Sequence, residues 1–211
     1  MNLLFERIRA DHVYTAPLEN IDDLLQQLEN KYQTSLPLAL KDFYRSFSEV
    51  RFFDDRFRMM SVTEIEPVSM LQYGSPGWCA PQWLAVLDVW DSNYVAIDLD
   101  TSQMLDCYHE AGGTSQIIAR DFKEFLERLL DSQGELYWLD EKFQAYGEAT
   151  YEPPAEFYRQ LDQNWWAKLG DEIGPETCST DSCQRKRLAL SVKCRRHHYE
   201  MIMNRECPFD E

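Results

Sequence analysis

The chain has 211 residues, of which 44% are hydrophobic, 13% aromatic and 27% charged, as expected for one domain of ordinary size with a smaller appendage. No apolar run approaches the roughly 18 residues of a membrane-spanning helix, and residues 1–17 lack the features of a secretory signal. We therefore expect a cytoplasmic protein with no membrane partner. The net charge of −16 is uneven, because residues 1–177 carry −18 and residues 178–211 carry +2. An acidic body disfavours nucleic acid and favours cationic partners, and the asymmetry indicates that the tail is a different module.

The first 82 residues predict two helices followed by two strands and a loop. Apolar residues recur at helical spacing over residues 17–32, and a second stripe runs from Pro37 to about Ser48. Residues 51–62 have the character of two strands, whereas residues 68–82 contain two glycines and two prolines and predict a loop.

Short polar turns separate three strand-like segments in the middle of the chain, which predicts an antiparallel meander. The segments are residues 83–89, 94–99 and 103–108. Asp121 is suited to cap a following helix, because apolar residues from Phe122 to Leu130 recur at spacings of three and four.

The remainder of the chain predicts two further helices separated by a linker. Residues 136–146 and 155–169 have helical patterns, and residues 148–154, which include two prolines, lie between them. A polar hinge, residues 170–177, leads into the tail.

The order of these elements resembles the SUKH superfamily, also called the Smi/Knr-type domain, over residues 18–131. The matching segments are Leu28-Glu29 with Tyr32, Leu36-Pro37, Lys41-Asp42-Phe43-Tyr44, residues 58–65, Trp83-Leu84-Ala85-Val86, residues 88–99 and residues 118–126. Asp121 stands where the family favours Ser, and either residue can cap a helix.

The resemblance implies an α+β fold with helices on one side of a curved antiparallel sheet. It also implies an immunity protein that binds a polymorphic or contact-dependent toxin, often a nuclease, and needs no catalytic group. We expect the acidic body to meet a basic toxin surface; Asp54, Asp55 and Asp91 are candidate contacts in acidic loops. The predicted domains are a SUKH-like domain over residues 1–147, a linker and amphipathic helix over 148–177, and a zinc-finger-like module over 178–211.

Four residues of the tail have the spacing of a structural zinc site, Cys178-x4-Cys183-x10-Cys194-x2-His197. Thiolate and imidazole ligands suit tetrahedral zinc, and four protein ligands leave no open position for water. The arrangement resembles a treble-clef or short zinc finger, and a segment this short needs such a staple. The alternatives to His197 as the fourth ligand are His198 and Cys207.

Basic residues between these cysteines, from Arg185 to Arg196, could contact phosphates or only neutralise the acidic body, and we favour neutralisation. A regulatory or scaffold protein that binds another protein or nucleic acid through the zinc module is the alternative function.

An enzyme is not expected, because no catalytic motif is present. The pair His109-Glu110 and the four aspartates of the meander are better explained by strand ends and hairpin turns, and the isolated cysteines lack a recognisable partner residue. These aspartates are Asp88, Asp91, Asp98 and Asp100, and the cysteines are Cys79 and Cys107.

Overall fold

The structure, a computed structural model, describes residues 1–74, 77–90, 93–108 and 113–209. The chain divides into two units, Met1–Pro153 and Pro154–Glu211. The boundary falls between two consecutive prolines, which cannot donate backbone hydrogen bonds to a continuing element.

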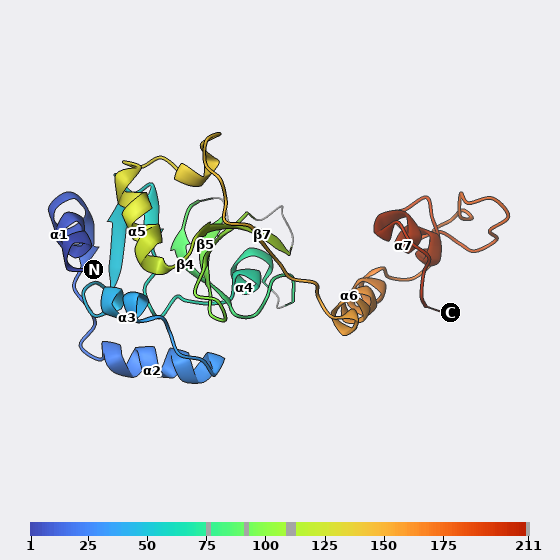
Figure 1. The fold of residues 1–211 in the computed structure, drawn as a ribbon. Coiled ribbons are helices and arrows are strands. Elements are labelled where there is room, and N and C mark those ends of the chain that lie inside the picture. Colours follow the sequence, from blue (N-terminus) through green and yellow to red (C-terminus); the bar gives the residue numbers. More distant parts are fainter. Residues whose placement is uncertain (75–76, 91–92, 109–112, 210–211) are drawn as a thin grey trace. The chain divides into compact units, whose positions relative to one another are not determined.

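The first unit is built on an antiparallel sheet that has eight strands within the described residues (Figure 1). The spatial order of the strands follows their order in the chain, so each strand pairs with its sequence neighbours. The strands are β1 (Val13–Thr15), β2 (Glu49–Phe52), β3 (Phe57–Met59), β4 (Trp83–Asp88), β5 (Tyr94–Asp98), β6 (Met104–Cys107), β7 (Thr114–Ala119) and β8 (Glu148–Thr150). The predicted meander is therefore the centre of a longer one.

One helix and two strands lie outside the pattern of elements that the sequence predicts. The helix α1 (Asn2–Asp11) and strand β1 lie in a segment for which the sequence predicts no element, and β8 lies in the segment expected to be a linker. The strands β1 and β8 are three residues long and exposed at the two edges of the sheet, so they lack the apolar alternation that identifies a strand.

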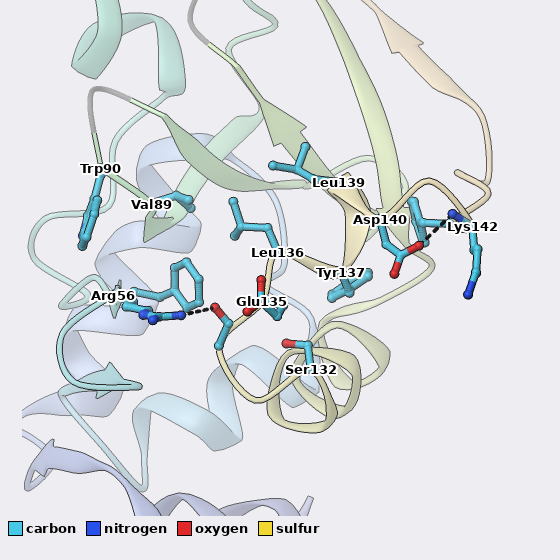
Figure 2. A pocket seen from close by; sticks show the side chains of 13 residues that line it. Arg56, Val89, Trp90, Ser132, Glu135, Leu136, Tyr137, Leu139, Asp140 and Lys142 are labelled. Atoms are coloured by element: carbon cyan, nitrogen blue, oxygen red, sulfur yellow. Dashed lines mark hydrogen bonds between the residues drawn. The ribbon is translucent and has the colours of Figure 1, made fainter.

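The predicted helix over residues 136–146 is wrong, because the structure has only a 3-10 turn, η1 (Tyr137–Leu139), followed by irregular chain (Figure 2). Side chains divert the backbone: the Tyr137 hydroxyl donates to the Ile118 carbonyl at 3.1 Å, and Asp140 Oδ1 accepts from the Lys142 N–H at 2.8 Å. The second bond is local and competes with the helical ladder, whereas the first joins the turn to β7, 19 residues earlier in the chain.

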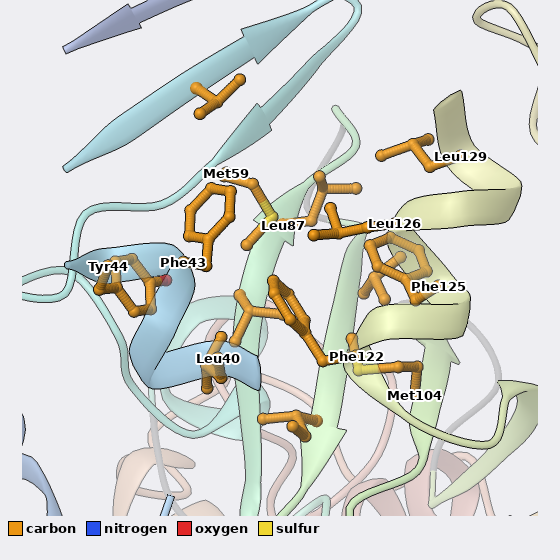
Figure 3. Packing of buried hydrophobic residues seen from close by; sticks show 14 of the residues in the cluster. Leu40, Phe43, Tyr44, Met59, Leu87, Met104, Phe122, Phe125, Leu126 and Leu129 are labelled. Carbon is orange, nitrogen blue, oxygen red and sulfur yellow. The ribbon is translucent and has the colours of Figure 1, made fainter. Parts of the chain in front are cut away.

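The main core lies between one face of the sheet and four helices. They are α1, α2 (Ile21–Tyr32), α3 (Leu38–Tyr44) and α5 (Phe122–Asp131). Phe43 of α3 and Phe122 of α5 are fully buried with ring centroids 5.6 Å apart, and Phe122 also contacts Phe125 (Figure 3). The α+β class with helices packed on an antiparallel sheet is confirmed.

A smaller cluster covers the opposite face at the centre of the sheet. Because strand residues alternate in direction, Leu84 and Val86 enter the main core while Ala85 enters this cluster. Ala96 is also part of it, and Val68 of the short helix α4 (Val68–Tyr73) packs here. The expected loop over residues 68–82 thus contains a helix.

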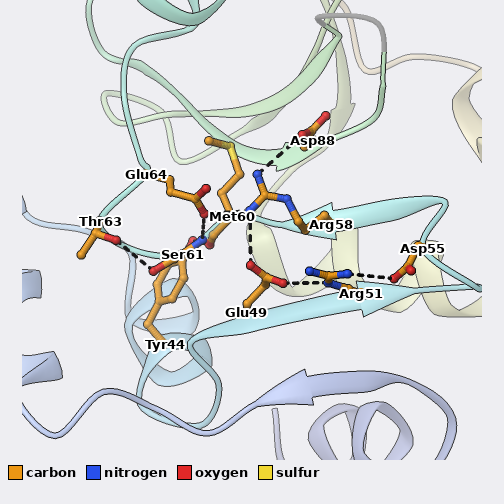
Figure 4. A network of polar contacts seen from close by, with 10 residues as sticks. All are labelled: Tyr44, Glu49, Arg51, Asp55, Arg58, Met60, Ser61, Thr63, Glu64 and Asp88. Atoms are coloured by element: carbon orange, nitrogen blue, oxygen red, sulfur yellow. Dashed lines mark hydrogen bonds and ion pairs between the residues drawn. The ribbon is translucent and has the colours of Figure 1, made fainter.

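An ion-pair network ties three strands together beside this sheet (Figure 4). Arg58 of β3 lies 3.3 Å from Glu49 of β2, 3.6 Å from Asp88 of β4 and 2.8 Å from Glu64. Glu49 also accepts a hydrogen bond from Arg51 at 2.9 Å. The network uses part of the acidic surplus for structure.

The second unit consists of α6 (Ala155–Lys168), a region of turns, and α7 (Arg195–Met203). The predicted helix over 155–169 is confirmed within one residue at its end. None of the helices in the described ranges is long and apolar enough to span a bilayer.

Candidate metal centre

The first two cysteines of the tail lie on a tight backbone turn. The Cys178 N–H donates to the Arg185 carbonyl at 2.8 Å, and the Cys183 N–H donates to the Thr180 carbonyl at 3.1 Å. Ser182, just before Cys183, has a left-handed backbone with φ of 64°. The turn brings both thiols to one side of the chain.

The other two residues come from the start of α7. Cys194 is the residue preceding the helix, and His197 lies on its first turn. The His198 N–H donates to the Cys194 carbonyl at 2.8 Å, which fixes the helix start beside Cys194. Residues three apart lie on the same helix face, so Cys194 and His197 point together.

The structure brings the ligand atoms of Cys178, Cys183, Cys194 and His197 within 4.8 Å of one another. His197 Nδ1 lies 3.3 Å from Cys178 Sγ and 3.2 Å from Cys194 Sγ, and the sulfurs of Cys183 and Cys194 are 3.9 Å apart. Tetrahedral zinc with Zn–S of about 2.3 Å and Zn–N of about 2.0–2.1 Å gives S···S of about 3.8 Å and S···N of about 3.5 Å. The cluster therefore has the dimensions and donor types of a tetrahedral thiolate and imidazole site.

The electrostatics around the cluster favour at least one thiolate. Burial raises the pKa of the Cys178 thiol, but hydrogen bonds from Thr180, His197 and nearby backbone together lower it to about 6. Burial raises the pKa of Cys194 to about 11. Metal binding releases thiol protons, so a divalent cation here would hold both sulfurs as thiolates. Glu200 Oε2 lies 3.9 Å from His197 Nε2, which is beyond hydrogen-bond distance.

The two alternative ligands point elsewhere. His198 Nδ1 lies 2.8 Å from Ser191 Oγ. The Cys207 thiol lies 3.7 Å from the Phe209 carbonyl oxygen, and the Cys207 N–H donates to Glu200. Neither belongs to the group of four ligand atoms within the described residues.

Glu172 organises the module, although the sequence placed it only in a polar hinge. Its carboxylate accepts from the Arg185 side chain at 2.7 Å and from the backbone N–H of Arg195 at 2.8 Å. Burial raises the pKa of Glu172, but these bonds outweigh burial and lower it. An acidic residue in a loop carries no sequence signal that would have identified this role.

Other basic residues of the tail are also engaged within the second unit. Arg187 pairs with Glu176 at 2.6 Å and Arg196 with Glu200 at 3.0 Å. The Arg195 guanidinium lies 4.5 Å from the centre of the Trp166 ring. Together with the pair of Arg185 and Glu172, these ion pairs engage three of the six basic residues between Arg185 and Arg196.

The remaining candidates of the sequence have structural roles where the structure describes them. Burial raises the pKa of the Cys79 thiol to about 11 and raises that of Cys107 as well, so neither is a ready nucleophile. Asp98 accepts from the Asp100 N–H and from Thr101, and Asp88 accepts from the Trp90 N–H, as hairpin-turn residues do.

Some of the candidate residues cannot be placed in this way. Asp91 and the pair His109-Glu110 lie outside the described residues. Asp54 and Asp55 lie in the exposed turn between β2 and β3, where Asp55 is 3.7 Å from Arg51.

Comparison with known proteins identifies the first unit. Residues 21–128 match the model of the SMI1 / KNR4 family (SUKH-1), which is half of the chain. The chain belongs to this family. It is also similar to a protein named immunity protein YokJ from Bacillus subtilis (strain 168), with 31% identity over 141 residues, 60% of this chain and 83% of that protein. The family match spans α2 to α5 and ends before the metal cluster.

Proposed function

We propose that this SUKH-1 protein is an immunity protein that neutralises a cognate toxin by binding it directly in the cytoplasm. The observation that carries the proposal is the similarity to immunity protein YokJ, which extends over 83% of that protein. The structure supports a binding role rather than an enzymatic one, because its isolated cysteines are buried and its hairpin aspartates are hydrogen-bonded within turns.

The partner we propose is a basic toxin of the nuclease type. Residues 1–153 contain 27 Asp or Glu and 12 Lys or Arg, a net charge of −15. A nuclease needs a cationic surface to hold phosphate, and opposite charges accelerate encounter and disfavour wrong partners. The engaged arginines of the tail argue against nucleic acid as the partner of this chain.

We further propose that Cys178, Cys183, Cys194 and His197 hold a zinc ion. The donor types and the distances between donor atoms fit zinc, and four protein ligands leave no open position for catalysis. Bound zinc would supply a cross-link between the cysteine turn and α7. The chain would then consist of a SUKH-like domain, a connecting segment with α6, and a zinc-finger-like module over residues 178–211. The predicted end of the first domain at residue 147 moves past β8, which pairs with β7, to Pro153.

Co-expression with the toxin encoded by the neighbouring gene tests the immunity function. We expect survival of cells that otherwise die, and co-purification of the two proteins as a tight 1:1 complex. A catalytically inactive toxin serves as the control for expression and allows the affinity to be measured. Killing without rescue, together with no complex, would reject the proposal for this pair.

A further inference from the structure

An open groove with apolar walls lies on the first unit, between the β2–β3 turn, the end of β4 and the segment after α5 (Figure 2). Its cavity has a volume of about 980 Å³, and Phe57, Val89 and Phe143 are among its lining residues. Two large apolar side chains on its lining face solvent, Trp90 with 64% and Leu139 with 67% of their surface exposed. Exposed tryptophan beside an apolar pocket is characteristic of the centres of protein interfaces.

The backbone around this groove adopts conformations that side chains ordinarily avoid. Trp90 has φ of 87°, Asp54 and Asp55 before the lining residue Arg56 have φ of 55° and 67°, and Gln133 beside the lining residue Gly134 has φ of 52°. A left-handed non-glycine residue carries a conformational cost and persists where surrounding structure or function requires it. Three separate segments with this feature meet at one groove.

A second cavity of about 800 Å³ continues the groove, and the charge of its lining differs from that of the first. It shares Val89, Leu136 and Leu139 with the first, and its charged lining residues are Asp106 and Glu148, both acidic. The first cavity, in contrast, has two basic and two acidic lining residues, Arg56, Lys142, Glu135 and Asp140. The groove therefore has an apolar end with balanced charge and an acidic end.

At the acidic end, the charged form of Asp106 is destabilised by burial, and a nearby cation would stabilise it. Burial raises the pKa of Asp106 to about 6, although a hydrogen bond with Trp138 opposes the rise. A carboxylate that has lost water is stabilised when an opposite charge comes within a few ångströms. The most effective partner group at this point is therefore an ammonium or a guanidinium.

We propose that this groove is where the toxin docks. The occupant is a protruding segment of the toxin that packs an apolar side chain against Trp90 and Leu139 and places an Arg or Lys beside Asp106 and Glu148. The assignment rests on the proposed immunity function and adds the surface and the chemistry of the partner segment. Charge supports this occupant at two scales, the acidic lining of the second cavity and the net −15 of residues 1–153.

The test measures the affinity of the full-length protein for the catalytically inactive toxin of the neighbouring gene. One variant pair, Trp90→Ala and Leu139→Ala, removes the apolar contacts, and a second pair, Asp106→Asn and Glu148→Gln, removes charge at nearly constant shape. Leu38→Ala on α3 and Asp23→Asn on α2 are matched controls, because both residues are exposed and absent from the lining of either cavity. Unfolding midpoints that do not fall below the wild-type value show that each variant is folded.

We expect Trp90→Ala and each charge variant to raise the dissociation constant at least about tenfold, and both controls to stay within about twofold. The charge variants should also weaken the dependence of affinity on salt. A wild-type complex whose affinity is unaffected by all four groove variants, or weakened equally by the controls, would overturn the groove and leave the immunity function standing. Absence of any wild-type complex would overturn the immunity function and this assignment with it.

Discussion

The two units of this chain are stabilised by different means. Residues 1–153 bury a continuous cluster of aromatic and aliphatic side chains, with Phe43 and Phe122 fully buried at its centre. In the described part of residues 154–211, the buried apolar side chains are those of Leu188, Tyr199 and three cysteines. A unit of this size gains little from its core, so the sulfur and histidine cluster and the surrounding ion pairs must supply what packing supplies in the first unit.

Removing one thiol of the cluster should give the largest difference between the two units in their response to a substitution. We expect Cys183→Ser, or a zinc chelator, to unfold the second unit, because structural zinc contributes on the order of 10–16 kcal/mol in zinc-finger peptides. The first unit should keep its unfolding midpoint. Hydrogen exchange of the full-length chain reads both units in one experiment, and mass spectrometry under native conditions counts bound zinc.

The matched control for this experiment is Cys207→Ser. Cys207 is also a largely buried thiol of the tail, with 9% of its surface exposed, but it lies outside the cluster, so this variant should keep about one zinc per chain. Loss of zinc in Cys207→Ser with retention in Cys183→Ser would show that a different ligand set holds the metal. Unchanged protection of α7 in Cys183→Ser would show that ion pairs alone hold the second unit.

A cavity in the main core should destabilise the first unit and leave the second unit unchanged. Phe122→Ala removes a fully buried ring that contacts Phe43 and Phe125, and such truncations cost about 3–5 kcal/mol. We expect the urea midpoint of the first unit to fall while zinc content stays constant. If zinc were lost together with the core, the two units would be thermodynamically coupled and the comparison would fail.

The same contrast explains what the sequence could and could not predict. The strands from 83 to 108 and the helix α5 were predictable, because their apolar residues repeat with the period of the element they form. The tail cluster was predictable for another reason: metal ligands need particular side chains at short spacings, and Cys178, Cys183, Cys194 and His197 provide them.

The elements that escaped prediction depend on contacts distant in sequence. The strand β8 exists through its pairing with β7, thirty-odd residues earlier in the chain, since Ala149 stands opposite Ser115. Residues 136–146 have a helical pattern, but the structure has only the 3-10 turn η1 there, and the Tyr137 hydroxyl donates to the Ile118 carbonyl of β7. The groove around Trp90 is assembled from three segments, so no single stretch of sequence signals it.

The stability of the first unit should depend on pH through Asp106, because burying this carboxylate in its charged form costs free energy of folding. Its folded pKa of about 6 lies above the ordinary value of 3.8, so the folded state binds the proton more tightly than the unfolded state does. The contribution of this group therefore favours folding at low pH and is lost as pH rises from about 4 to about 6, by roughly 1–3 kcal/mol. We expect Asp106→Asn to be more stable than wild type at pH 7, with the difference vanishing near pH 4.

Urea unfolding of both proteins from pH 4 to pH 7 measures this difference, and subtraction removes the titration of the other carboxylates. Equal stabilities at pH 7 would mean that Asp106 is well solvated in the folded protein. The expected gain also makes Asp106→Asn a clean variant for binding experiments, because a loss of affinity could not be assigned to unfolding.

The smallest effect we expect concerns the N-terminal cap of a helix, which differs between the two units. In α5, Asp121 Oδ1 accepts from the Glu124 N–H at 2.8 Å and caps the helix, and Glu124 accepts from the N–H of Arg120, the residue before the cap. We expect Asp121→Ala to cost about 1 kcal/mol, and Asp121→Ser, which can accept the same bond, to cost less. Urea unfolding of the first unit measures both variants, and equal costs would show that the cap bond contributes little.

The helix α7 of the second unit begins at Cys194 without a side-chain cap bond, so its start depends on the sulfur and histidine cluster instead. The cap of α5 is thus one of many small contributions to the stability of the first unit. Its loss should leave that unit folded, because the core around Phe43 and Phe122 remains intact. The corresponding position in the second unit, Cys194, is a member of the candidate metal cluster. If Asp121→Ala unfolded the first unit completely, its core would be far weaker than its burial indicates, and the difference between the two units would be one of degree.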